Sequence, residues 1–182
     1  MATYVPSVSD AELTSTWSYT YNSSSGLPYQ PTGVTSASKT RTVSLSAIPD
    51  GAEVTAVSYS CTTTNSPSSV GTSYIWKKFD NKDGSNLTSS SIKTYLNGLN
   101  RKYSGKSLVL YYGMKANPSA KSSPSPTSLK VTFATTLKIT YVVYVYFGSG
   151  GAWVPCEMYY GRNGSWKQVI PYYGKNGEWK QA

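Results

Sequence analysis

The sequence predicts an all-β protein: a jelly-roll-like β-sandwich body over residues 1–147, followed by a C-terminal β-hairpin or meander extension over residues 148–182. Three observations favour this fold class. Short alternating segments separated by turn residues recur along the body, which is typical of a sandwich. The composition, with 14% aromatic and only 14% charged residues, suits strands with half-buried surfaces. The third observation is a series of repeated strand-and-turn phrases that closes the chain.

The first half of the body contains segments that we expect to be strands. Residues 13–21 alternate, and a loop rich in Gly, Pro and Ser follows at 22–33. Residues 40–48 lead into the Pro-Asp-Gly turn at 49–51, where Pro sets φ and Gly permits a left-handed conformation. Residues 52–64 form the next expected strand. Its alternation gives two faces, with Val54, Ala56 and Ser58 on one and Val57, Tyr59 and Cys61 on the other.

The second half of the body continues the same pattern. We expect a strand over 72–79 and a turn over 79–86. A further strand is expected at 106–114, and 117–128 is a polar loop containing three Pro residues. Residues 128–147 then supply either two strands or one long bent strand.

A single short helix is predicted over residues 89–99, because its apolar side chains recur at helical spacing. Ser residues ahead of these positions are suited to cap the helix, and Gly98 keeps it short. The apolar positions, at i, i+3, i+4 and i+7, are Ile92, Tyr95, Leu96 and Leu99.

The end of the chain repeats the phrase Y-[YF]-G-x-x-G-x-W in steps of 13 residues, and the copies begin at Tyr146, Tyr159 and Tyr172. Four-residue turns, GSGG, GRNG and GKNG, separate segments of about nine residues, and their Gly and Asn residues tolerate the positive φ that tight hairpins need. We therefore expect an up-and-down meander that grows from a strand ending at Phe147. Its alternation would place Trp166, Gln168, Ile170 and Tyr172 on one face, and Lys167, Val169 and Tyr173 on the other.

The extension is expected to need a packing partner. Pro155 and Pro171 cannot donate to a ladder, so they belong at edges or bulges. A lone meander of this length is marginal in water. Its partner would be the body, a sister subunit or another protein, and its aromatic residues would either pack between subunits or stack on sugar rings. These candidate contact residues are Trp153, Trp166, Trp179, Tyr159, Tyr160, Tyr172 and Tyr173.

The charge is strongly basic, with 17 Lys and Arg against 8 Asp and Glu and a formal net charge of +9. Residues 77–106 carry a local excess of basic side chains. This excess either solubilises the protein or favours an anionic partner. Nucleic acid is not the partner we expect, because binding would need aromatic residues interleaved with the basic ones along one groove.

We expect no catalytic residue, metal or cofactor. The chain has no His, which excludes Ser-His-Asp and Cys-His sites and His-ligated metals. Its carboxylates mostly flank turns or lie near the termini, and no phosphate-binding loop is present. Residues 79–84 resemble a calcium loop, but Lys82 and Gly84 occupy positions where ligands are needed. Cys61 and Cys156 are too few for a disulfide framework.

The sequence also bears on membrane insertion and on secretion. No stretch approaches the length of a membrane span, so no membrane insertion is expected. The N-terminal residues 1–10 lack the basic start and apolar run of a signal peptide. We therefore expect synthesis in the cytoplasm and, if the protein ends up outside a cell, no export by the ordinary secretory route.

The repeated phrases, with the endings Trp166-Lys167 and Trp179-Lys180, resemble the C-terminal ends of minor structural and tail proteins of bacteriophages that infect Gram-positive bacteria. The body segment PDGAEVTAVSYSCT is similar in style to the β-sandwich domains of such proteins. The first copy departs from the pattern, because it has Val154 where the others have Lys. Choline-binding repeats of surface proteins also string Gly, Trp and Tyr along hairpins, but those repeats are longer than the 13-residue step here.

The resemblance implies a non-enzymatic virion structural protein, from the tail or baseplate or decorating the head. Such a protein would be a homo-oligomer that contacts other virion proteins, and lysis of the host would release it. The family has no shared catalytic residues. The alternative is a carbohydrate-binding adhesin or receptor-binding module that recognises glycans of the host cell wall.

Overall fold

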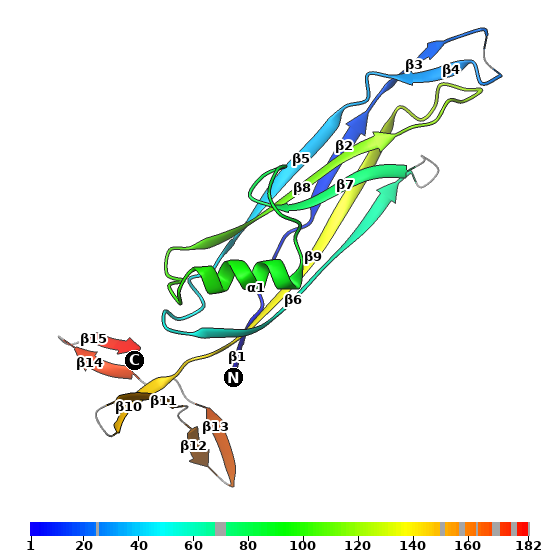
Figure 1. The fold of residues 1–182 in the computed structure, drawn as a ribbon. Helices are drawn as coiled ribbons and strands as arrows, with labels where there is room; N and C mark the ends of the chain where they lie inside the picture. The colour runs from blue at the N-terminus through cyan, green and yellow to red at the C-terminus, as the bar shows by residue number, and fades with distance from the viewer. Residues whose placement is uncertain are drawn as a thin grey trace.

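The structure is a computed structural model, and it describes residues 1–24, 26–67, 72–149, 152–156, 159–162, 164–168, 172–175 and 178–181. The described residues form antiparallel sheets and one short helix, which confirms the all-β class (Figure 1). The elements of the body are β1 (Ala2–Tyr4), β2 (Ala11–Thr16), β3 (Ser18–Tyr21), β4 (Tyr29–Thr32), β5 (Ser36–Ser44), β6 (Glu53–Ser66), β7 (Thr72–Phe79), α1 (Ser89–Gly98), β8 (Ser107–Asn117) and β9 (Ser128–Val142).

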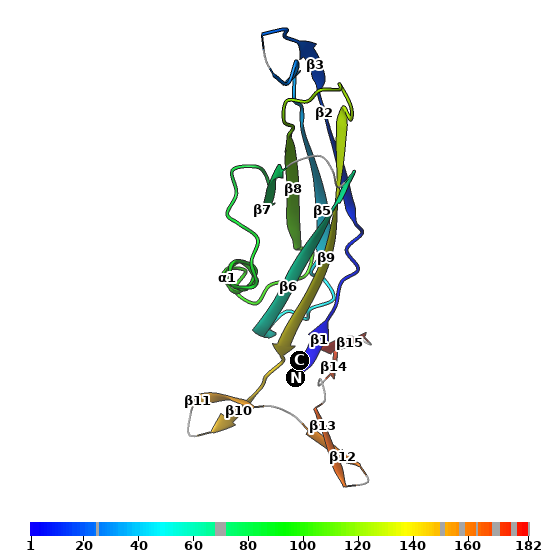
Figure 2. The ribbon, with the colours of Figure 1, turned by 90° about the vertical axis from the view of Figure 1, so that its right-hand side faces the viewer.

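Two larger sheets form most of the elongated body, and β3 and β4 form a small two-stranded sheet. In the first, β9 is central: β6 pairs along one side of it, and β1 and β2 pair with the two ends of its other side. In the second, β8 is central between β5 and β7. Figure 2 shows the two sheets side by side, with α1 beside β6. The jelly-roll connectivity of the expected sandwich is not confirmed by these pairings.

The core lies between the two central strands, because every second residue along each of them is buried; Gly113 of β8 and Val142 at the end of β9 are buried in addition. The ring centroids of Tyr112 on β8 and Phe133 on β9 are 5.2 Å apart. The Tyr112 hydroxyl also lies 2.7 Å from Thr135 Oγ1 of β9, so the one buried polar pair between these strands is satisfied among the described residues. Helix α1 closes one end of the core with Ile92 and Leu96, both fully buried.

Several expected elements are confirmed. The strand at 72–79 and the helix are found where the sequence predicts them. The N-cap is Thr88 rather than a Ser, and Ser91 completes the capping box from the third helical position. The Pro-Asp-Gly turn is also present, with Gly51 at a φ of 86°. Of the two alternatives for residues 128–147, the structure has two strands: β9 ends at Val142, and β10 (Val145–Ser149) begins within the segment.

Other expectations are wrong, for local reasons. The loop expected at 22–33 contains β4, in which Pro31 pairs with Tyr19; Pro is tolerated there because the two-stranded sheet of β3 and β4 has only edge strands. In β6, the register shifts between Val54 and Ala56, so one extra residue, Thr55, reverses the alternation. Val54 is therefore buried on the same side as the partly buried set Val57, Tyr59 and Cys61.

Side chains protect the sheet edge that β6 presents away from β9. The Lys93 ammonium donates to the Thr55 carbonyl over 2.8 Å, and the Tyr59 N–H donates to Ser89 Oγ over 3.0 Å. Farther along, the Lys77 ammonium of β7 donates to the Cys61 carbonyl over 2.8 Å. These contacts occupy backbone groups that an incoming strand would otherwise use, and the Lys77 contact also ties the two sheets together.

The C-terminal extension forms separate hairpins rather than the expected meander. The two strands of each hairpin are joined by two residues instead of four, and each expected nine-residue strand is divided between two hairpins. Pro155 pairs with Tyr146 in a two-stranded sheet and thus occupies an edge strand, as expected, while Pro171 lies outside the described residues. The hairpins are β10 (Val145–Ser149) with β11 (Ala152–Cys156), β12 (Tyr159–Arg162) with β13 (Ser165–Gln168), and β14 (Tyr172–Lys175) with β15 (Glu178–Gln181).

The pair between Tyr112 and Thr135 generates a prediction about stability. Replacing Thr135→Val removes one partner and leaves the buried Tyr112 hydroxyl unsatisfied, so we expect a loss of about 1–3 kcal/mol in the free energy of unfolding. Replacing Tyr112→Phe as well removes both partners, and the double variant should recover much of that loss. Urea denaturation of the wild type, both single variants and the double variant measures the coupling. Additive losses in the four proteins would contradict a direct bond.

Candidate functional site

The register of the C-terminal hairpins accounts for the spacing of the repeat. In each hairpin the Trp pairs with the first Gly of its own phrase: Trp153 with Gly148, Trp166 with Gly161 and Trp179 with Gly174. The phrase G-x-x-G-x-W thus runs up one strand, through a two-residue connection and back to the position opposite its start. One copy of the repeat encodes one hairpin.

The register also assigns the predicted contact residues to faces. Tyr159 and Trp166 lie diagonally on one face of their hairpin, because Trp166 is opposite Gly161 and Gly161 is two residues from Tyr159. On the other face Tyr160 pairs with Lys167. The last hairpin repeats both placements, with Tyr172 and Trp179 on one face and Tyr173 paired with Lys180 on the other.

The structure distributes the seven predicted residues over three small sheets and does not gather them into one site. Within the described ranges, the strands of each hairpin contact only one another. The expected single face of Trp166, Gln168, Ile170 and Tyr172 is therefore wrong for Tyr172, which belongs to the next hairpin, while Ile170 is outside the described residues. Asn-Gly as a two-residue hairpin connection is the sequence signal that could have revealed the division.

The basic residues between 77 and 106 do not form one continuous anion-binding stripe. Lys77 and Lys93 are used on the edge of β6, as described above. The ammonium of Lys82 lies 2.7 Å from Asp83 Oδ1, and the guanidinium of Arg101 lies 2.7 Å from Glu53 Oε2. Four of the basic side chains in this stretch therefore have partners within the body.

A polar hollow lies where the end of α1 approaches the start of β6. Its volume is about 610 Å³, and its lining includes Glu53, Lys93 and Arg101. Asn100 and Arg101 adopt consecutive left-handed conformations, with φ of 50° and 60°. The Gly51 N–H donates to the Arg101 carbonyl over 2.7 Å, which fixes the loop after α1 against the 49–51 turn.

The carboxylate of Asp50 is the second attachment of this loop. Its Oδ1 accepts from the backbone N–H groups of Tyr103 and Ser104, over 2.5 and 2.8 Å. These bonds, from Ser104 and then Tyr103, hold the pKa of Asp50 below its usual value. The backbone conformation around the hollow thus has a structural cause in the anchoring of the loop.

Neither a metal site nor a membrane-spanning helix is found in the described part of the chain. It contains no group of three or more His, Cys, Asp and Glu side chains that could hold a metal ion. None of its helices is long and apolar enough to cross a membrane.

Comparison of the chain with protein-family models, with curated proteins and with solved structures finds no match. The functional proposals below therefore depend on the residues and geometry of this chain.

The Asp50 contacts predict how acid affects stability. Because the pKa of Asp50 is lower in the folded state, the unfolded state binds its proton first as the pH falls. The stabilisation is present above the unfolded value of 3.8 and is lost as the pH falls through the folded pKa. We expect Asp50→Asn to lower the melting temperature at neutral pH and to flatten its decline in acid.

Thermal unfolding followed by circular dichroism over a series of pH values measures this effect. Asp10→Asn is the control, since it removes a carboxylate elsewhere on the body surface. Parallel declines of the wild type and Asp50→Asn would contradict the anchoring role.

Proposed function

We propose that the protein is a non-enzymatic structural protein of a bacteriophage virion, a tail, baseplate or head-decoration component, which assembles with copies of itself and with other virion proteins through its C-terminal hairpins. The observation that carries the proposal is the threefold repetition of one hairpin with the same Gly-to-Trp register. Its resemblance to the ends of phage tail proteins supplies the setting. The virion would be its location after lysis of the host.

The hairpins support an assembly role because each has little stability on its own. Strands of four or five residues paired only once are marginal in water. Both strands of such a hairpin are edges, with backbone groups available to another strand. Tyr and Trp are enriched at protein interfaces, and each hairpin supplies at least one of each. A partner would therefore stabilise the hairpins as it binds them.

Three copies in series also support attachment by several weak contacts. Once the first hairpin is bound, the next is held close to its own partner by a short connection, which raises its effective concentration. A symmetric assembly that presents the same surface repeatedly would offer one binding position to each of the three hairpins. Contacts from Lys77, Ser89 and Lys93 already occupy backbone groups on the β6 edge of the body, so this edge is less open to a strand of another protein. In this proposal the hairpins make the contacts with partners, and the body is the rigid element that they connect to the particle.

A second candidate function is the recognition of cell-wall glycans by the same hairpins. The observation that favours it is the placement of Tyr159 with Trp166, and of Tyr172 with Trp179, on one face of their hairpins. Such aromatic pairs are suited to stacking on sugar rings. The experiment below separates the two candidates because it measures assembly in the absence of any glycan.

We expect the double variant Trp166→Ala/Trp179→Ala to keep the melting temperature of the body and to lose oligomer mass and incorporation into particles. The body keeps its stability because these residues belong to hairpins whose strands pair apart from the sheets of the body. Analytical ultracentrifugation of the full chain and particle reconstitution measure the loss. The matched control is Tyr21→Ala/Tyr74→Ala, which removes two exposed aromatic side chains of the body and should assemble normally. Unchanged oligomer mass and incorporation in the Trp double variant would disprove the assembly role.

A further inference from the structure

The outer face of the second sheet carries an aromatic groove, and the residues given for its lining all belong to the body. Trp76 of β7, Gly113 of β8 and Ser38 of β5 pair in one row across the sheet. Tyr111 lies on the same face of β8, two residues from Gly113. The groove has a volume of about 400 Å³, within the usual range for small-molecule sites. Its lining is Ser36, Ala37, Ser38, Trp76, Lys82, Asp83 and Tyr111.

Gly113 leaves the space that the two aromatic rings occupy. A Cβ atom at this position would lie 3.0 Å from Trp76 Cε3 and 3.2 Å from Tyr111 Cε1, closer than nine in ten real Cβ contacts. Gly113 is itself buried although it lies on the outer face of the sheet. The rings of Trp76 and Tyr111 therefore stand close over the backbone of the central strand, and both remain partly exposed.

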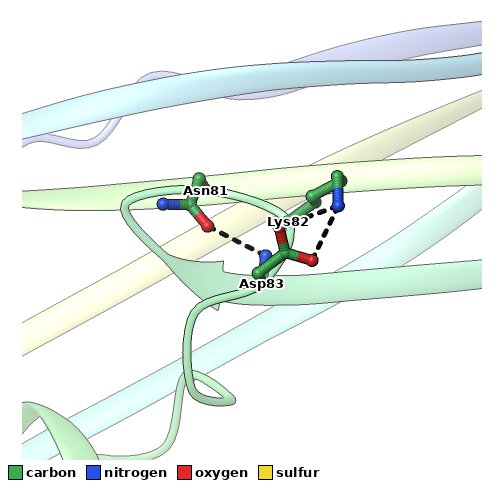
Figure 3. A network of polar contacts seen from close by, with 3 residues as sticks. All are labelled: Asn81, Lys82 and Asp83. Atoms are coloured by element: carbon green, nitrogen blue, oxygen red, sulfur yellow. Dashed lines mark hydrogen bonds and ion pairs between the residues drawn. The ribbon is translucent and has the colours of Figure 1, made fainter.

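The turn after β7 supplies a charged but balanced rim. The Lys82 ammonium lies 2.7 Å from both carboxylate oxygens of Asp83 (Figure 3). The Asp83 N–H donates to Asn81 Oδ1 over 2.9 Å, which fixes the turn locally. The rim thus offers one cation and one carboxylate whose charges cancel, and Ser36 and Ser38 add hydroxyl groups on the opposite strand.

We propose that this groove binds a pyranose ring of a glycan, with the apolar face of the sugar against Trp76 and its hydroxyl groups toward Asp83, Lys82 and the two Ser residues. An indole offers an apolar, electron-rich surface to the C–H groups of a sugar. The ion pair and the hydroxyl groups supply both donors and acceptors, which is what a ring of hydroxyl groups requires.

The same features argue against other ligand classes. An anion such as a nucleic-acid phosphate would meet the Asp83 carboxylate and would have to compete for the ammonium of Lys82. An extended peptide would find no free backbone at the floor, because β8 is paired on both sides. A neutral, polyhydroxylated ring has neither difficulty.

This inference places glycan binding in the body, and it is separate from the second candidate function, in which the hairpins bind the glycan. It leaves the proposed assembly role unchanged, since an attachment protein of a virion needs both a connection to the particle and a surface for the host. The assembly role is tested by oligomer mass and the groove by sugar binding, so one can fail without the other.

The test titrates the full-length, 15N-labelled protein with a panel of methyl hexopyranosides and methyl N-acetylhexosaminides. Indole N–H signals in NMR spectra are assigned by single Trp→Phe variants. We expect a saturable shift of the Trp76 signal with at least one sugar, and no saturable shift for Trp153, Trp166 or Trp179. Binding should be insensitive to salt, whereas nucleic-acid binding falls steeply with salt concentration.

Two variants fill or empty the groove. Trp76→Ala should weaken binding by roughly tenfold or more, as removal of an aromatic anchor does. Gly113→Ala should do the same by pushing the Trp76 ring from its place, and it covers the case in which Trp76→Ala fails to fold. The matched control is Tyr74→Ala, on the same strand and face but outside the groove, which should bind as the wild type does. The inference would be overturned if no sugar shifts the Trp76 signal, or if a folded groove variant binds sugar as well as the wild type does. Loss of sugar binding only in Trp166→Ala/Trp179→Ala would also overturn it, because the site would then lie in the hairpins.

Discussion

The body depends on the packing of its two central strands, β8 and β9, which follow one another in the chain and face one another across the core. Each is paired on both sides, so neither can be displaced without breaking two ladders. The contacts of Tyr112 with Phe133 and Thr135 fix their relative position. The earlier strands must then supply the flanks of both sheets, which explains why β5, β6 and β7 alternate between the sheets along the chain.

An open sandwich leaves strand edges along both of its sides. Here side chains connect the two sheets along each side, which we call the two seams. On one seam Lys77 reaches from β7 to the Cys61 carbonyl. On the other, the Ser15 hydroxyl donates to the Thr35 carbonyl and also accepts the Ala116 N–H. Arg41 donates to the carbonyls of Ser9 and Asp10 beside it. These contacts are used for stability, and the outer face of the second sheet takes no part in them.

The sequence predicts those features that local patterning determines. The strand at 72–79, the helix and the hairpin-forming repeat all follow from periodicity and turn chemistry within short windows. Features that depend on register between distant segments were missed, such as the extra residue Thr55 and the use of Lys77 in a seam. The row of Ser38, Gly113 and Trp76 joins three strands that are far apart in the chain, so no local pattern reveals the groove.

One structural device connects the groove with the hairpins. Trp76 is opposite Gly113 in the body, and Trp153, Trp166 and Trp179 are each opposite a Gly in their hairpins. Gly weakens a strand, and an aromatic residue on the neighbouring strand offsets that weakness by covering the exposed backbone. At Gly113 the contact distances show that the ring occupies the space a side chain would need. The same Gly-to-Trp pairing recurs in the register of four separate sheets, so one backbone feature is common to the body and the hairpins.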